Sequence, residues 1–289
     1  MLPDSFVTFL QSVSDSKIFL CASAGNSGDL LLQKGLVTYL ENKKHILVAD
    51  AESADIIMIH GGANINDIWK EGIGLLKSML QTYPDTKIVV APHTFEFWET
   101  NFESILADAT AQIHLFARER SSYDCLQSLN IPANISLYLS NDTAFLLEGT
   151  KYLDDLIASS TKSYVLYAMR TDRESAILPL DLDRVPQNFF EKGKLILINW
   201  KLNRFIKHTN NGNTASNKSI LEDISYLPYA EFVEKVQHAS EIHTDRLHVG
   251  ILAALLKKKV YLYPTKYAKV RGVYNQSLKQ YTTVEPQFD

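Results

Sequence analysis

The feature that most constrains the fold of this chain is its alternation of short apolar runs with longer amphipathic segments. Runs that are apolar along their whole length are typical of strands buried on both faces, which occur in parallel sheets covered by helices. The predicted strands of the first half are 17–22, 46–48, 54–60, 87–91 and 112–117. The predicted helices between them are 29–40, 68–82, 101–109 and 120–129.

The same pattern restarts after Gly149, with predicted strands at 164–168, 195–198, 241–244 and 259–263. Helices are expected at 228–239 and 246–256, and a polar loop at 207–218. We therefore predict an α/β protein of two Rossmann-like, doubly wound domains, residues 1–150 and 151–289, that face each other across a cleft. Ligands of such sheets bind at the carboxyl ends of the strands.

Composition and charge exclude several classes of protein. The net charge of -4 disfavours a general nucleic-acid binder. Cys21 and Cys125 are too few for a disulfide scaffold or a cysteine-rich zinc site, which indicates a reducing compartment. The first residues show no secretory signal, and the longest apolar stretch, 249–256, is too short to span a bilayer. We expect a cytoplasmic protein, at most peripheral at the inner face of the membrane.

The strongest local motif is Thr244-Asp-Arg-Leu-His248, where a short strand leads directly into an apolar helix. With Thr244 or Asp245 as the cap, Arg246 and His248 fall in the first turn. Free N–H groups, the positive end of the helix dipole and a guanidinium there favour binding of phosphate or carboxylate, and a histidine can transfer a proton. In the alternative, Arg246 pairs with an acid and His248 packs under a loop.

Basic residues are concentrated around this motif. Residues 241–280 contain eight lysines and arginines and two acids, a local charge of +6. Within this stretch Tyr267, Lys269 and Arg271 lie beside a glycine and indicate the rim of a pocket for an anionic ligand. A basic surface helix is an equally good interpretation of the spacing. No metal site is predicted, because His243 and His248 are five residues apart and do not share a helical face.

Two loops at the carboxyl edge of the first predicted sheet combine glycine with amide and carboxylate side chains. Asn26 and Asp29 follow the first strand, and Asn64 and Asp67 follow the third. These side chains can hydrogen-bond sugar hydroxyls, although glycine, asparagine and aspartate are also the ordinary residues of turns. Neither loop fits a P-loop or a dinucleotide-binding loop.

A third group of polar residues follows other strands. Arg118 leaves its strand at the carboxyl end, pointing at the predicted cleft, whereas Arg120 is expected to face solvent. Asp142, Arg170 and Glu174 are interpreted as an ion-pair network between the two domains.

Taken in order, these motifs resemble the polysaccharide pyruvyl transferase family. The matching stretches are 26–29, 61–64 through Trp69, 118–122, 142–145, 170–174, 244–248 and 267–272. The chain departs from the family pattern at Ala63 and Asn66, where glycine is common, and at Glu119, where aspartate is usual.

The resemblance implies a GT-B-like fold and transfer of the pyruvyl group of phosphoenolpyruvate to a sugar, with release of phosphate. The acceptor would be a hexose such as galactose in an exopolysaccharide or capsule precursor, either free or lipid-linked, and the product a cyclic ketal. By the same pattern Arg118, Arg246 and His248 would contact the donor and Asp67 the sugar. The chemistry needs no metal and no cofactor, and homo-oligomerisation stays open.

Two other functions fit the same observations. A GT-B glycosyltransferase that uses a nucleotide sugar would need the same fold and a similar basic phosphate site. A non-catalytic glycan-binding protein could keep the fold without turnover, but the presence of Arg118, Arg246 and His248 argues against it.

Overall fold

The computed structural model describes residues 4–22, 25–170, 172, 174–176 and 218–288. The chain divides into two compact units, the first formed by Met1–Thr150 with Gly272–Gln280 and the second by Lys151–Arg271 with Tyr281–Asp289. The segment 272–280 therefore belongs to the first unit, where Ser277 donates a hydrogen bond to Asn141 over 2.7 Å. The predicted strand at 195–198 and most of the predicted loop at 207–218 lie outside the described residues.

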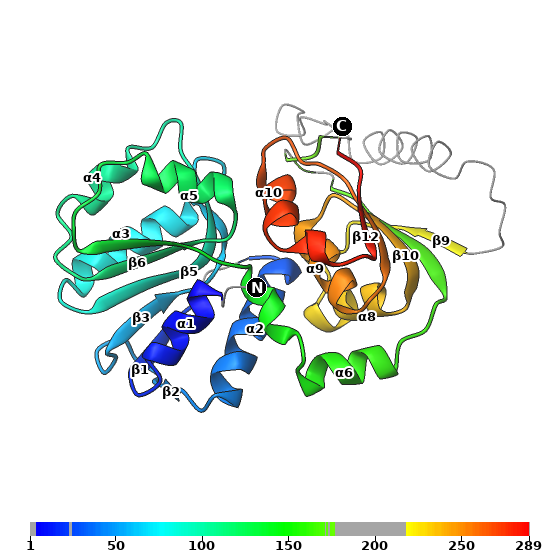
Figure 1. Ribbon diagram of the computed structural model, residues 1–289, viewed down its shortest axis with the longest axis horizontal. Coiled ribbons are helices and arrows are strands. Elements are labelled where there is room, and N and C mark those ends of the chain that lie inside the picture. Colours follow the sequence, from blue (N-terminus) through cyan, green and yellow to red (C-terminus); the bar gives the residue numbers. More distant parts are fainter. Residues whose placement is uncertain (1–3, 23–24, 171, 173, 177–217, 289) are drawn as a thin grey trace, which may run out of the picture. The chain divides into compact units, whose positions relative to one another are not determined.

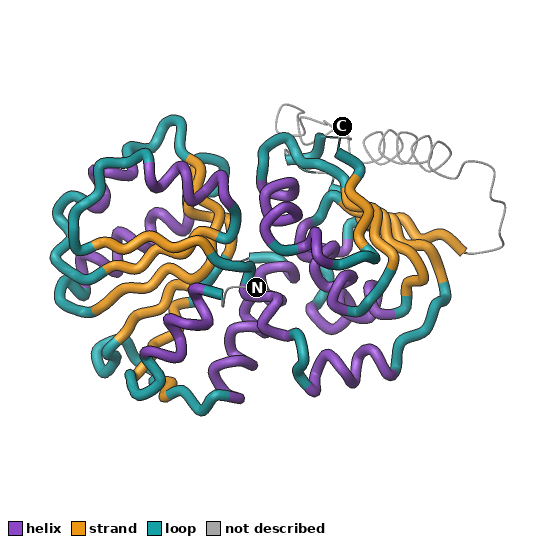
Figure 2. The backbone as a smooth tube through the Cα atoms, in the orientation of Figure 1, coloured by secondary structure: helices purple, strands orange, loops and turns teal. Residues whose placement is uncertain are grey.

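The first unit is built on a parallel sheet, seven-stranded in its described part, with the order β2-β1-β3-β5-β6-β7 and β4 paired to β5. The figures show it as one layer between helices (Figures 1 and 2). Its strands are β1 (Lys17–Cys21), β2 (Ile46–Leu47), β3 (Ile56–Ile59), β4 (Gly62–Asn66), β5 (Lys87–Glu96), β6 (Ile113–Ala117) and β7 (Ile135–Leu139).

Helices cover both faces of this sheet, as its apolar strands predict. One core packs α1 and α2 against alternate residues such as Met58 and Val89, and the other packs α3, α4 and α5 against Ile57 and Val90. The helices are α1 (Ser5–Ser12), α2 (Ser27–Asn42), α3 (Glu71–Thr82), α4 (Phe102–Leu106) and α5 (Arg120–Gln127), followed by the 3-10 turn η1 (Thr143–Leu147).

The second unit repeats this plan with a five-stranded parallel sheet in its described part, in the order β9-β8-β10-β11-β12. Its strands are β8 (Tyr164–Ala168), β9 (Lys218–Leu221), β10 (Ala239–Thr244), β11 (Lys259–Leu262) and β12 (Val284–Pro286). Its helical elements are α6 (Lys151–Ala158), η3 (Ile224–Tyr226), α8 (Tyr229–Gln237) and α9 (Leu247–Leu255). Helix α10 (Lys269–Gln276) and the turn η4 (Leu278–Gln280) complete the described chain.

Both sheets are Rossmann-like, which confirms the predicted α/β class. Most predicted strands and helices lie where the apolar pattern places them. The segment from Gly62 to Asn66 was expected to be a loop and is the strand β4, paired to β5. Among the described residues, no helix is both long and apolar enough to cross a membrane.

Helix α2 approaches η1 so closely that Gly35 has no room for a side chain. A Cβ added at Gly35 would lie 2.2 Å from the carbonyl oxygen of Thr143 and 3.2 Å from the Cα of Ala144. Because these neighbours are backbone atoms, they cannot rotate away. The contact fixes η1, and with it Asp142 just before it, against the helix.

We expect Gly35→Ala to lower the free energy of unfolding by about 2–4 kcal/mol, because relief of the clash requires backbone movement. The matched control is Gly74→Ala in helix α3, where an added Cβ meets nothing within 4 Å. That change should be neutral or stabilise by up to about 1 kcal/mol. Urea unfolding of both variants checks the prediction, and equal stabilities would contradict the close packing of α2 on η1.

Candidate functional site

In the described part of the chain, the strand order of each sheet has one switch point, at which successive connections leave in opposite directions. In the first unit it lies between β1 and β3, and in the second between β8 and β10. Ligands of open parallel sheets bind outside the carboxyl ends of the strands at such points. Residues from the predicted motifs follow these strands: Asn26 follows β1, Gly61 follows β3, Arg170 follows β8 and Arg246 follows β10.

After β1, Asn26 and Asp29 build the amino terminus of helix α2. The Asn26 side chain accepts a hydrogen bond from the Gly28 N–H over 2.8 Å, and Asp29 accepts one from the Asn26 N–H over 2.8 Å. This reciprocal arrangement is a capping box. Helix α2 begins at Ser27, two residues before the predicted start at residue 29, and Asn26 is its cap.

After β3 and within β5 lie two buried histidines that the sequence analysis did not select. The Nε2 atom of His93 accepts hydrogen bonds from the N–H groups of Asn64 and Ile65, at 3.0 and 3.1 Å. The Nδ1 atom of His60 lies 3.3 Å from the Gly61 carbonyl oxygen. Burial lowers the pKa of both imidazoles, and the Arg118 guanidinium lowers that of His93 further. Both rings are therefore neutral near pH 7.

Arg118 is fully buried in an ion-pair network of the first unit. Its Nη1 atom lies 2.8 Å from an oxygen of Asp142, its Nε atom donates to the Thr94 hydroxyl over 3.0 Å, and Glu119 lies 3.5 Å from Nε. Both carboxylates are also buried. These bonds engage Nε and Nη1 of the guanidinium, and the predicted contact between Arg118 and the donor stays a prediction.

Asp67 holds the loop that follows β5. One of its carboxylate oxygens accepts the N–H groups of Trp98, Glu99 and Thr100, at 2.6, 2.7 and 3.1 Å. The other accepts the Thr100 hydroxyl. Burial alone would raise the pKa of Asp67, but these hydrogen bonds lower it below its usual range. The structure gives Asp67 a positioning role, and the predicted contact with a sugar stays a prediction.

The side chain of Asn64 is packed rather than open. Its Oδ1 atom would lie 2.3 Å from a Cβ added at Gly72, at the start of helix α3. The residue is partly exposed, and its backbone N–H is bound by His93. Asn64 therefore helps to seat α3 on β4, and the structure does not test whether it also binds a sugar.

In the second unit, Arg246 is the cap residue of helix α9 and is buried. The predicted cap Thr244 instead accepts the Arg246 N–H over 2.9 Å through its hydroxyl. Two acids hold the guanidinium: Asp172 lies 3.0 Å from Nη1, and Asp223 pairs with Nη2. The buried Nε atom of Arg246 has no hydrogen-bond partner within the described part of the chain.

A second buried network lies after β8. Glu174 pairs with both Arg170 and Lys269, at 2.9 and 2.8 Å. Burial opposes ionisation of Asp172, but its bonds to Arg170 lower its pKa, and the nearby charge of Glu174 raises that of Arg170. Arg170 pairs with Glu174 inside the second unit, and Asp142 pairs with Arg118 inside the first. The ion-pair network between the domains stays a prediction.

Two other residues of the motif, Asp245 and His248, differ in environment. Asp245 is fully buried and accepts the Arg170 N–H over 2.7 Å, and burial raises its pKa to about 6. His248 is partly exposed in the first turn of α9. Of the two, His248 has the accessibility that a proton-transfer group needs.

The basic and aromatic segment predicted as a pocket rim forms the start of helix α10 and the turn before it. Lys269 lies 5.1 Å from the centre of the Tyr267 ring, and Arg271 lies 5.3 Å from that of Phe288. The acids that neutralise Arg246 and Lys269 come from outside residues 241–280. The local charge of +6 is therefore partly cancelled in the fold.

The structure adds residues that no sequence signal singled out. Asp223 and the exposed Tyr226 of η3 both contact Arg246, the latter with its ring centre 5.9 Å from the guanidinium carbon. Their distance of about twenty residues along the chain hides this contact from sequence reasoning. Among the described residues, no group of three or more histidine, cysteine or acidic side chains could hold a metal ion.

Fold and site together define an α/β protein with two Rossmann-like sheets and an arginine-bearing helix terminus at the second switch point. The chain belongs to the polysaccharide pyruvyl transferase family, whose sequence model matches residues 15–267. This confirms the resemblance seen in the motifs.

Individual proteins are more distant. EpsO of Bacillus subtilis (strain 168), whose name provisionally calls it a pyruvyl transferase, is 25% identical over 269 residues, which cover 85% of this chain and 80% of EpsO. The crystal structure of an uncharacterized protein from Klebsiella pneumoniae subsp. pneumoniae NTUH-K2044 has the same fold, with a TM-score of 0.66 and 22% identity over 98% of this chain and 97% of that one.

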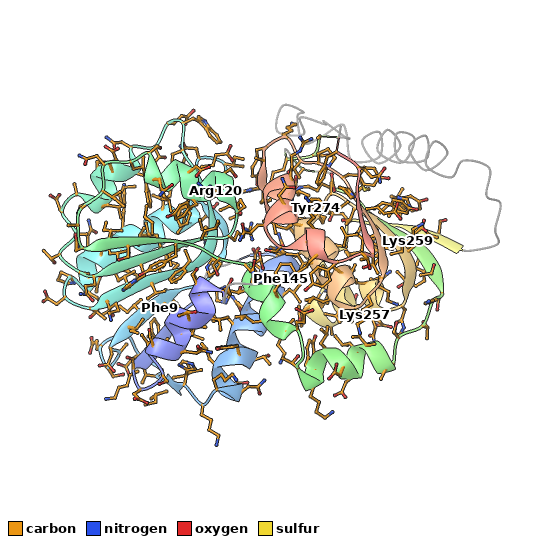
Figure 3. The ribbon with its side chains drawn as sticks, in the orientation of Figure 1. Phe9, Arg120, Phe145, Lys257, Lys259 and Tyr274 are labelled. Atoms are coloured by element: carbon orange, nitrogen blue, oxygen red, sulfur yellow. The ribbon has the colours of Figure 1, made fainter. Side chains whose placement is uncertain are left out.

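We expect Arg118→Leu to destabilise the protein by about 3–5 kcal/mol, because it leaves two buried carboxylates without their cation. The control is Arg120→Leu. Arg120, labelled in Figure 3, is 67% exposed and pairs with the exposed Asp124. Its loss should change stability by no more than about 0.5 kcal/mol. Urea unfolding measures both, and a small effect at position 118 would show that the network is not structural.

Stability should fall as the pH drops below about 6.5, where unfolded histidine takes up a proton. Because the folded-state pKa of His93 is lowered, its contribution is complete above the unfolded pKa and is lost as the pH falls toward the folded value. Between pH 6.5 and 5.5 the loss should be smaller in His93→Gln than in the unchanged protein by about 1 kcal/mol. Identical pH dependence of urea unfolding in the two proteins would contradict this.

Proposed function

We propose that this protein transfers the pyruvyl group of phosphoenolpyruvate to a hexose of a polysaccharide precursor, forming a cyclic ketal and releasing phosphate. Membership of the pyruvyl transferase family supports the group transferred. The name of EpsO supports the same reaction class. The identity of the donor, the hexose acceptor and the form of the product are the parts that this proposal adds.

The observation that carries the proposal is the geometry of Arg246. Asp172 and Asp223 engage its two Nη atoms, while the buried Nε–H lacks an acceptor within the described residues. A buried donor without an acceptor costs free energy, which an anionic oxygen of a ligand would recover. The two acids thus orient the guanidinium, and its remaining Nε–H group determines the direction from which an anion is bound.

The amino terminus of α9 adds to this anion site. The first N–H groups of a helix have no partner inside the helix, and the dipole favours negative charge there. Phosphoenolpyruvate carries both a phosphate and a carboxylate, so it can use a guanidinium and a helix terminus at once. We assign Arg246 and this terminus to the donor.

His248 is the residue to which we assign proton transfer. The imidazolium gives its proton to the methylene carbon of the donor, and a sugar hydroxyl attacks the neighbouring carbon and returns a proton to the ring. The bond from that carbon to the phosphate oxygen then breaks, and a second hydroxyl closes the ketal. The two hydroxyl protons end on the new methyl group and on phosphate, so the reaction balances without a metal or a redox cofactor.

Mass spectrometry of a panel of hexosides incubated with phosphoenolpyruvate tests the proposal. A pyruvyl adduct together with one equivalent of phosphate supports it. Transfer of a glycosyl group from a nucleotide sugar in the same assay would overturn it in favour of a glycosyltransferase. Binding of hexosides with no turnover of either donor would overturn it in favour of a glycan-binding protein.

We expect His248→Ala to lower pyruvyl transfer by about 10²–10⁴-fold, the contribution that a general acid–base residue makes. Arg246→Lys should raise the KM for the donor, because an ammonium group cannot reproduce the planar fork held between two acids. His238→Ala is the control, since His238 precedes β10 at the other end of the strand. Unchanged activity in His248→Ala, with an unfolding midpoint close to the parent's, would remove His248 from the mechanism.

A further inference from the structure

The loop after β5 displays a large aromatic side chain that the fold does not use. Trp98 is 58% exposed, the most exposed tryptophan among the described residues. Its neighbour Phe97 turns the other way and stacks on Phe102, with ring centres 4.4 Å apart. The chain therefore anchors one aromatic ring in the core and leaves the next one in solvent.

The backbone that carries Trp98 is held firmly by Asp67. The Asp67 side chain is completely buried and accepts the N–H groups of residues 98, 99 and 100 with one oxygen, at 2.6, 2.7 and 3.1 Å. Hydrogen bonds to a charged acceptor are among the stronger ones in proteins. A fixed backbone lowers the entropy lost when an aromatic side chain meets a ligand.

Trp98 lies beyond the carboxyl edge of the first sheet. Trp98 lies two residues beyond the last residue of β5, and Asp67 directly follows β4, the strand paired to β5. The Asp67 N–H donates to the Glu96 carbonyl over 3.1 Å, so both loops leave the sheet together. The carboxyl edge of a parallel sheet is where its ligands bind.

Charged residues adjoin Trp98 along the chain, because Glu99 is the next residue and is paired with Lys70. Lys70 lies 3.3 Å from Glu99, and both side chains are more than half exposed. A hexopyranose has an apolar face of C–H groups and a rim of hydroxyls, so it matches an aromatic surface with charged donors and acceptors at its border. A purely apolar partner would remove water from Lys70 and Glu99 without replacing its hydrogen bonds, which is unfavourable.

We propose that Trp98 is the platform on which the acceptor hexose stacks, and that Asp67 is a positioning residue that acts through the loop of Trp98. The inference rests on the proposed function for the identity of the acceptor. Asp67 then serves the sugar side without direct contact, because its carboxylate accepts hydrogen bonds from the loop of Trp98.

Saturation-transfer NMR with methyl β-D-galactopyranoside and methyl β-D-glucopyranoside tests the contact without turnover. We expect transfer to the C–H protons of one sugar face in the parent protein, a several-fold loss in Trp98→Ala, and recovery in Trp98→Phe. The control is Ile46→Ala, which removes a comparably exposed apolar side chain at the amino-terminal edge of the same sheet. Unchanged transfer in Trp98→Ala would overturn the proposal.

Steady-state kinetics give a second reading. Trp98→Ala should raise the KM for the acceptor by about five- to thirty-fold while leaving the KM for phosphoenolpyruvate unchanged. If Asp67 acts through the loop, Asp67→Asn should shift the same parameter, and the two changes together should be less than additive. Full additivity would overturn the positioning role of Asp67.

The outcomes separate this inference from the proposed function. If the protein transfers pyruvyl groups and Trp98→Ala has the same acceptor KM as the parent, the platform is overturned and the proposed function is not affected. Sugar contacts that depend on Trp98, without any pyruvyl transfer, overturn the function and leave the platform standing. Concentration-dependent self-association of the parent protein that Trp98→Ala abolishes, measured by sedimentation without sugar, would overturn the platform in favour of a contact between copies of the chain.

Discussion

Parallel strand pairing is the constraint on which the rest of this structure depends. A parallel pair cannot be joined by a tight hairpin, so each connection must cross a face of the sheet, and both faces become buried. When the strand order reverses direction, adjacent loops separate at the carboxyl edge. This happens between β1 and β3 in one unit and between β8 and β10 in the other. Residues that follow those strands are thereby gathered from distant parts of the sequence.

The two edges present different chemistry. The edge of the first unit has amide groups, neutral histidines and the displayed ring of Trp98, while Arg118 is enclosed with its own acids. The edge of the second unit has Arg246 at a helix terminus beside the accessible His248. Neutral polar and aromatic groups suit a sugar, and a directed guanidinium suits an anion. The division matches the two substrates of the proposed reaction.

Apolar periodicity was sufficient to predict most strands and helices of this fold, because burial on both faces leaves a strong signal in each run. Apolar periodicity failed at β4, because its sequence Gly-Ala-Asn-Ile-Asn is typical of a turn. This segment is a strand that pairs with β5. Residue types at the edges were also predictable, but their partners were not. Arg118 meets Asp142, 24 residues away, and Asp67 meets Trp98, 31 residues away. A motif alone cannot tell a ligand contact from such an internal bond.

The local charge of +6 illustrates the same limit and leads to a physical conclusion. Asp172, Glu174 and Asp223 bring compensating charge from other parts of the chain to Arg246 and Lys269. A neutralised cluster exerts little long-range attraction on an anion, so the proposed recognition of the donor depends on short, directed bonds. Arginine serves this better than lysine, because two of its nitrogens can be held by acids while a third stays directed at a ligand. The acids beside Arg246 therefore fix the orientation of its guanidinium, and they also weaken its long-range attraction for anions.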